Sequence, residues 1–98
     1  MNNSRKRKKT LIRRETREED GILYRYELKI HENEHFSYAP PQYSISIEMI
    51  LPDGSTTYRE MSEIFLDAGK AILYFDRLVK NLATPIDLPY IVEDDLYS

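Results

Sequence analysis

The chain has no cysteine among its 98 residues, which excludes disulfide bonds, cysteine-ligated zinc and a thiol nucleophile. It has only three glycines and no glycine-rich phosphate-binding motif. No apolar run approaches the roughly 20 residues that span a bilayer. After the basic N-terminus only Leu11 and Ile12 are apolar, where a secretory signal needs an apolar stretch of roughly 7–15 residues. We therefore expect a single small cytoplasmic domain.

Charge is divided unevenly along the chain. Residues 1–17 contain eight Lys or Arg and one Glu, a net charge of +7, and the remainder contains six Lys or Arg and sixteen acids, a net charge of −10. Residues 1–9 have too little apolar surface to offset the entropy of ordering. We predict that residues 1–9 are a disordered basic arm and that residues 10–98 form one domain.

Alternating patterns predict β-strands in the first two thirds of the chain. Residues 10–17 are a weak strand candidate, and Asp20-Gly21 after them is a strong hairpin signal. Residues 22–31 and 43–51 alternate between apolar and polar side chains, with residues 32–42 as a loop. Pro52-Asp53-Gly54-Ser55 is a turn, which makes residues 56–63 a returning strand.

The last third predicts helices. Asp67 is a suitable N-cap, and apolar residues then recur at three- and four-residue spacing from Ala68 to Leu82. Thr84-Pro85 should end this helix. Asp87 should cap a second short helix that extends to Leu96. Strands followed by helices predict an α+β fold: a meander of about four antiparallel strands, with both helices packed on one face.

His31-Glu32-Asn33-Glu34-His35 matches H-E-x-x-H, the zinc-protease motif. That chemistry needs a helix, because only a helical turn aims both imidazoles at one ion. Here a strand precedes the motif and prolines follow it. We expect a solvated loop with two exposed histidines and no metal site. No catalytic Ser–His–acid arrangement is evident, so we expect neither enzymatic activity nor a cofactor.

Three other features could bind a ligand. The run Arg5, Lys6, Arg7, Lys8 and Lys9 could contact nucleic acid through phosphates, although no aromatic residue is interleaved for base stacking. The eight tyrosines could form an aromatic platform on an uncovered sheet face, although packing in the core is the default. Glu93-Asp94-Asp95 lacks the ligand spacing of a calcium site, so we interpret it as a solvated helix end.

The segments LYRYEL (23–28), YSISIEM (43–49) and FDRLVKNLATPIDLPYIVEDDL (75–96) resemble a family of short proteins from Gram-positive anaerobes, domain of unknown function 6514. Asn81, Pro85, Leu88 and Asp94 fill positions of the family's C-terminal pattern, while Ser44 stands where glycine is common. The resemblance implies no activity, cofactor or catalytic residue.

Two hypotheses of function remain from the sequence. The first is a non-enzymatic binding or regulatory module that acts on an unknown protein partner or forms a homo-oligomer, since sheet edges and bare faces recruit partners. The alternative is a nucleic-acid-associated protein that uses the basic arm.

Overall fold

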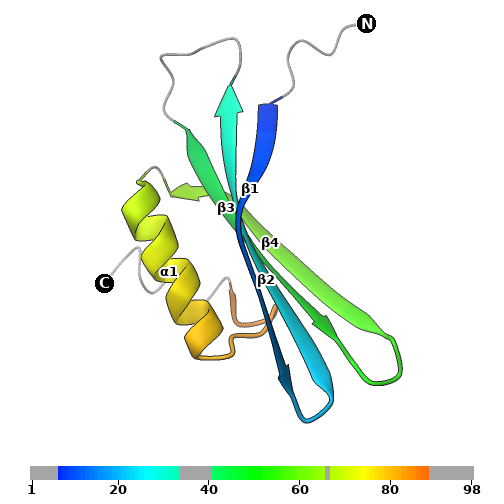
Figure 1. The fold of residues 1–98 in the computed structure, drawn as a ribbon. Helices are drawn as coiled ribbons and strands as arrows, with labels where there is room; N and C mark the ends of the chain where they lie inside the picture. The colour runs from blue at the N-terminus through cyan, green and yellow to red at the C-terminus, as the bar shows by residue number, and fades with distance from the viewer. Residues whose placement is uncertain (1–6, 34–40, 66, 89–98) are drawn as a thin grey trace, which may run out of the picture.

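The protein folds as a two-layer α+β domain. The computed structural model describes residues 7–33, 41–65 and 67–88. These contain the strands β1 (Arg7–Glu19), β2 (Ile22–Asn33), β3 (Gln42–Ile50) and β4 (Thr56–Phe65) and the helix α1 (Ala68–Lys80). The strands form one antiparallel sheet in the order β1-β2-β3-β4, and α1 lies on one face of it (Figure 1). The predicted meander is therefore confirmed.

Both predicted hairpin turns are present. Asp20 and Gly21 have φ angles of 55° and 81°, as a two-residue type I′ turn requires. In the second turn Gly54 has a φ of 92°. The Asp53 carboxylate accepts hydrogen bonds from the Ser55 hydroxyl (2.7 Å) and amide (2.9 Å), which lower the pKa of Asp53. These local interactions set the register of the two hairpins.

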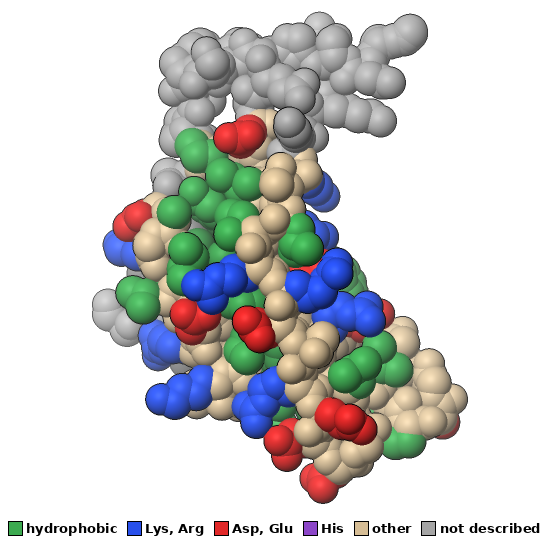
Figure 2. All heavy atoms as spheres, in the orientation of Figure 1, with side chains coloured by type: hydrophobic (Ala, Val, Ile, Leu, Met, Phe, Trp, Pro, Cys, Tyr) green, Lys and Arg blue, Asp and Glu red, His purple; other side chains and the backbone are tan. Residues whose placement is uncertain are grey.

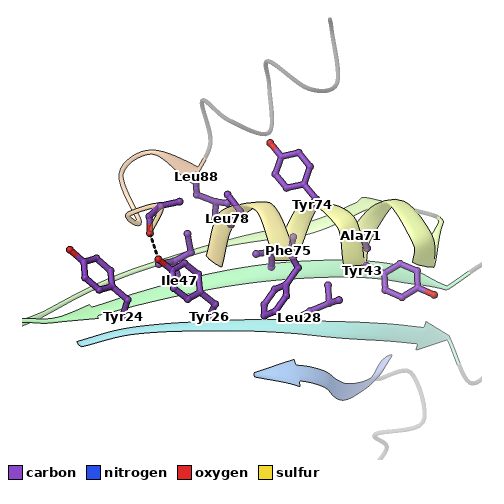
Figure 3. Packing of buried hydrophobic residues seen from close by; sticks show 12 residues of the cluster. Tyr24, Tyr26, Leu28, Tyr43, Ile47, Ala71, Tyr74, Phe75, Leu78 and Leu88 are labelled. Carbon is purple, nitrogen blue, oxygen red and sulfur yellow. Dashed lines mark hydrogen bonds between the residues drawn. The ribbon is translucent and has the colours of Figure 1, made fainter. Parts of the chain in front are cut away.

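Alternation along β2 and β3 directs one set of side chains into the core, as predicted. Tyr24, Tyr26 and Leu28 from β2 lie beside Tyr43, Ile45 and Ile47 from β3, all buried. Figure 3 shows α1 lying over this surface, with Phe75 directed at the sheet near Leu28. Burial of these side chains is the main source of stability.

The helix begins as predicted and ends earlier. Asp67 Oδ1 accepts a hydrogen bond from the Gly69 amide at 3.0 Å, which confirms the N-cap. The helix ends at Lys80, before Thr84-Pro85. Leu82 has a φ of 55°, and the Leu82 and Ala83 amides donate to the carbonyls of Val79 and Leu78, the two bonds of a Schellman motif.

Arg17 of β1 also binds this end of the helix. Its guanidinium donates hydrogen bonds to the carbonyl oxygens of Val79 (3.0 Å) and Lys80 (3.2 Å). A cation at this position also interacts favourably with the helix dipole. The edge strand is thus fastened to the helix.

After the helix the chain folds back onto the sheet. The Tyr26 hydroxyl donates to the Ala83 carbonyl at 2.8 Å, and burial raises the pKa of Tyr26 to about 12. The Thr84 hydroxyl donates to the Asp87 carboxylate at 2.9 Å, and Leu88 is buried in the core. The second predicted helix falls mainly on residues 89–98, which lie outside the described residues.

The start of the domain differs from the predicted boundary. β1 begins at Arg7, so Arg7, Lys8 and Lys9 belong to the sheet and not to an arm. The prediction of disorder for the six residues before Arg7 lies outside the described residues. Among the described residues, no helix is long and apolar enough to cross a membrane.

Candidate functional site

The sheet face opposite α1 carries charged and hydroxyl side chains, and we call it the polar face. Among the described residues, three ion pairs lie on it. Arg14 Nε–Glu27 (2.8 Å) and Arg25 Nη1–Glu48 (2.9 Å) join neighbouring strands, and Lys29 Nζ–Glu27 (3.6 Å) lies within β2. Glu27 accepts from two of these cations. Opposite charges are therefore paired with one another over the described part of the polar face.

A hydrogen-bond chain of three residues, two of them buried, lies at one end of the polar face. His31 Nε2 is 2.8 Å from Ser44 Oγ, and Ser44 Oγ donates to Glu60 at 3.2 Å. Since the single hydroxyl hydrogen is used on Glu60, His31 must donate from Nε2 in this arrangement. The chain joins β2, β3 and β4 across the sheet.

This chain resembles a catalytic triad in composition but not in order. In a triad the histidine lies between the nucleophile and the carboxylate, so that it can remove the hydroxyl proton. Here Ser44 lies between His31 and Glu60, and Ser44 is only 1% exposed. A histidine that donates to Ser44 cannot act as its base. The chain is therefore suited to holding three strands together.

The expectation of two exposed histidines in a loop is wrong for His31. His31 belongs to β2, which extends to Asn33, and its side chain is buried. An extended backbone at His31 cannot provide the helical turn that H-E-x-x-H needs. His35 lies outside the described residues. Within the described ranges, no three His, Cys, Asp or Glu side chains are grouped to hold a metal ion.

The tyrosines of the strands lie mainly in the core. Tyr24, Tyr26 and Tyr43 are buried on the sheet face that α1 covers, as the default interpretation expects. Tyr58 lies on the polar face opposite Glu48 and is 53% exposed. It is the one strand tyrosine of the described segments on that face, so these segments provide no aromatic platform.

The five basic residues predicted to contact nucleic acid fall on both sides of the start of β1. Arg5 and Lys6 lie outside the described residues, while Arg7, Lys8 and Lys9 occupy strand positions opposite the end of β2. Glu93-Asp94-Asp95 also lies outside the described residues.

A small pocket lies beside the helix. Its volume is about 40 Å³, and it is lined by Tyr74, Arg77, Leu78, Asn81 and Ala83. Small-molecule sites usually have volumes of about 300–1,000 Å³. The pocket therefore does not suit a metabolite.

The two outer strands present different edges. Between the bulge at Ile12 and the turn, β1 reads RRETREE, with six charged residues of seven. The paired half of β4 begins Thr56-Thr57-Tyr58, with no charge. In the described parts of the chain no element pairs with the outer side of either strand.

The backbone groups that β4 directs outward follow from its hairpin. The Leu51 amide donates to the Ser55 carbonyl at 2.9 Å, which makes these residues a hydrogen-bonded pair. Since such pairs alternate along antiparallel strands, Thr57 bonds to β3, while Thr56, Tyr58 and Glu60 direct their backbone groups outward. These outward groups can pair with an added strand.

Comparison with known proteins identifies a family. Neither the search of curated proteins nor the search of solved structures finds a match. The model of a family described as "Family of unknown function (DUF6514)" matches residues 7–97, nearly the whole chain. The resemblance seen in the sequence is thus confirmed, and the chain belongs to the DUF6514 family.

Proposed function

We propose that this protein is a non-enzymatic protein-binding module that adds an extended segment of a partner to its sheet at β4. The observation that carries the proposal is the uncharged edge at Thr56, Thr57 and Tyr58, whose outer side pairs with no element of the described residues. Unpaired strand edges are templates for another chain unless charge, proline or a bulge protects them. Thr56, Thr57 and Tyr58 have none of these protections, and the first charged residues of β4 are Arg59 and Glu60.

The surroundings of this edge suit a peptide. Backbone pairing would supply affinity, and side chains beside the edge would supply specificity. Tyr58 offers an exposed aromatic ring next to the outward amides, and aromatic side chains are frequent anchors in interfaces. The Glu60 carboxylate is held by Ser44, which fixes the far end of the paired segment.

A displayed peptide library tests this proposal. We expect selection on the full chain to enrich peptides that bind with micromolar affinity and that protect the β4 amides from hydrogen exchange. Tyr58→Pro removes one outward amide and keeps the bonds to β3. It should weaken binding by at least about tenfold, about 1.4 kcal/mol.

Two controls make the result specific. Tyr58→Ala keeps the amide and loses only the ring, so it should weaken binding less than Tyr58→Pro. Thr16→Pro makes the same backbone change on β1 and should leave peptide affinity unchanged. Selection that enriches no peptide, or affinity that survives Tyr58→Pro, would contradict the proposal.

A further inference from the structure

The edge of β1 has a charge pattern that is complementary to itself. Its regular segment runs from Arg13 to Glu19, bounded by the bulge at Ile12 and the turn at Asp20. Reversing the direction of RRETREE about its central Thr16 exchanges each base for an acid. In an antiparallel pair of two such segments centred on Thr16, every charged residue faces an opposite charge. The facing pairs are Arg13 with Glu19, Arg14 with Glu18 and Glu15 with Arg17.

The backbone allows the same register. The two-residue turn makes Glu19 and Ile22 a hydrogen-bonded pair, so bonding to β2 alternates from there along β1. Arg14, Thr16 and Glu18 consequently direct their amides and carbonyls away from β2. A pair centred on Thr16 matches these three residues with the same three residues of a second strand. The charge pattern and the hydrogen-bonding pattern therefore select one register.

From this agreement we propose that β1 pairs with β1 of a second copy of this chain, antiparallel and centred on Thr16, to give a symmetric dimer with an eight-stranded sheet. The dimer involves the edge opposite β4 and does not depend on peptide binding at β4. Its interface is isologous, the commonest arrangement in homodimers.

The charged groups of β1 are available for this pairing. Glu15 and Glu18 are exposed, and their side chains have no hydrogen bond or ion pair to the part of the chain that the structure describes. Arg13 and Arg17 bind Asp76 and Glu19 at 3.1 Å, in pairs that are at least one third exposed. Arg17 also donates to the carbonyls of Val79 and Lys80, and Arg14 pairs with Glu27 at 2.8 Å. Exposed ion pairs are worth little, and a guanidinium has five N–H groups, so each arginine can keep these bonds and add one to a facing glutamate. Figure 2, in the view where β1 lies in front of the sheet, shows acidic and basic side chains interspersed.

The position of the helix leaves room for the second copy. A two-fold axis through an antiparallel strand pair is perpendicular to the sheet, so both helices would lie on the same face of the joined sheet. α1 packs chiefly over β2, one strand in from the edge. Neither helix therefore needs to move.

Charge also explains why β1 would select its own copy. When most other strands approach a charged edge, like charges repel each other or charged groups lose water without gaining a partner. These costs protect the edge from general aggregation. A strand with the complementary pattern avoids that penalty, and β1 itself has this pattern. Specificity then arises because any other partner strand or register would place like charges opposite each other or leave charges unpaired.

Sedimentation and light scattering on the full chain, up to about 0.5 mM, test the dimer. We expect a concentration-dependent dimer that added salt weakens, because exposed ion pairs are screened. Glu18→Arg places an arginine opposite Arg14 of the other copy, and the two-fold symmetry repeats this repulsion at a second position. The variant should therefore weaken dimerisation by at least about tenfold. Glu32→Arg makes the same charge change at an exposed β2 residue outside the interface and should leave the dimer unchanged. Circular dichroism checks that each variant folds.

Mixing two variants gives a stricter test. Glu18→Arg places Arg opposite Arg14, and Arg14→Glu places Glu opposite Glu18, so each variant alone should be monomeric. In their heterodimer both facing positions again hold opposite charges, so mixing should restore dimers. Arg14→Glu removes the ion pair with Glu27 and could therefore fail to fold. In that case Thr16→Pro, which removes the central outward amide, tests the interface instead and should give monomers.

Three results would overturn the proposal. The first is a wild-type chain that remains monomeric throughout the concentration range. The second is a mixture of folded charge variants that forms no heterodimer. The third is a dimer that survives Thr16→Pro and dissociates with Tyr58→Pro, which would place the contact at β4.

Discussion

Replacing Phe75 with alanine should remove a large part of the stability of this domain. Phe75 is fully buried between α1 and the sheet, at the centre of the helix and near Leu28 (Figure 3). Truncating a buried phenylalanine costs about 3–5 kcal/mol, because apolar contacts are lost and the cavity collapses only partly. A domain of this size has a free energy of unfolding of about 5–15 kcal/mol. The variant should therefore be only marginally folded.

Urea unfolding followed by far-UV circular dichroism measures this loss. With a slope of about 1–2 kcal/mol/M, the midpoint should fall by at least about 1.5 M. Protein concentration must be held constant, since dimerisation would also contribute to stability. If Phe75→Ala does not fold at all, Phe75→Leu provides a milder test at about 1–2 kcal/mol.

Leu73→Ala is the matched control on the same helix. Leu73 is 67% exposed, and alanine has at least equal helix propensity, so stability should change by less than about 0.5 kcal/mol. A loss below about 1 kcal/mol for Phe75→Ala would show that the assigned inner face of α1 is wrong.

Further measurements test other parts of the structure. The pKa of Tyr26 is raised to about 12 in the folded protein, so Tyr26 keeps its proton to a higher pH when folded than when unfolded. The free energy of unfolding should therefore fall as pH rises from about 10 to 12, by at most about 3 kcal/mol. Tyr26→Phe should abolish that part of the pH dependence. Asp67→Ala removes the N-cap of α1 and should cost about 0.5–2 kcal/mol in urea unfolding, and a free energy equal to wild type would mean that the cap is dispensable. Elemental analysis of untagged protein should find no stoichiometric zinc, and about one zinc per chain that is lost with His31→Ala would contradict this. Deleting residues 2–6 should leave the melting temperature nearly unchanged, and duplex DNA should be retained in gel shifts only at low salt. Micromolar binding that survives about 150 mM salt would favour the nucleic-acid alternative.

The strands and their buried faces could be predicted because their pattern is local. Apolar residues at every second position of β2 and β3 leave one choice of inward face, and Asp20-Gly21 and Asp53-Gly54 mark the turns between strands. The helix start was equally visible in Asp67. Each of these features depends on residues close together in the sequence.

The helix end could not be predicted in this way. Leu82 takes a left-handed conformation that usually favours glycine, so no residue type marks the Schellman motif. Arg17, which binds the last carbonyls, lies more than sixty residues earlier in the chain. Thr84-Pro85 was the first visible stop, and it lies beyond the true one.

The hydrogen-bond chain of His31, Ser44 and Glu60 was missed for a related reason. Each residue belongs to the polar alternation of its strand, which ordinarily indicates exposure. The register of the three strands brings these side chains within hydrogen-bonding distance, and His31 and Ser44 are buried. Strand register depends on pairing between separate segments, so the residue pattern of a single strand does not predict it.

The charge asymmetry of the sequence acquires a different meaning in the structure. The division at residue 17 suggested a basic arm attached to an acidic body, yet β1 itself runs from basic at Arg7 to acidic at Glu19. A strand with opposite charges at its two ends is suited to an antiparallel copy of itself, whereas β4 lacks such a gradient over Thr56-Thr57-Tyr58. Pairing at β1 would place the two β4 edges at opposite ends of one continuous sheet. Each dimer would then present two identical peptide-binding edges, and linked sites of this kind raise the avidity for a partner with repeated segments.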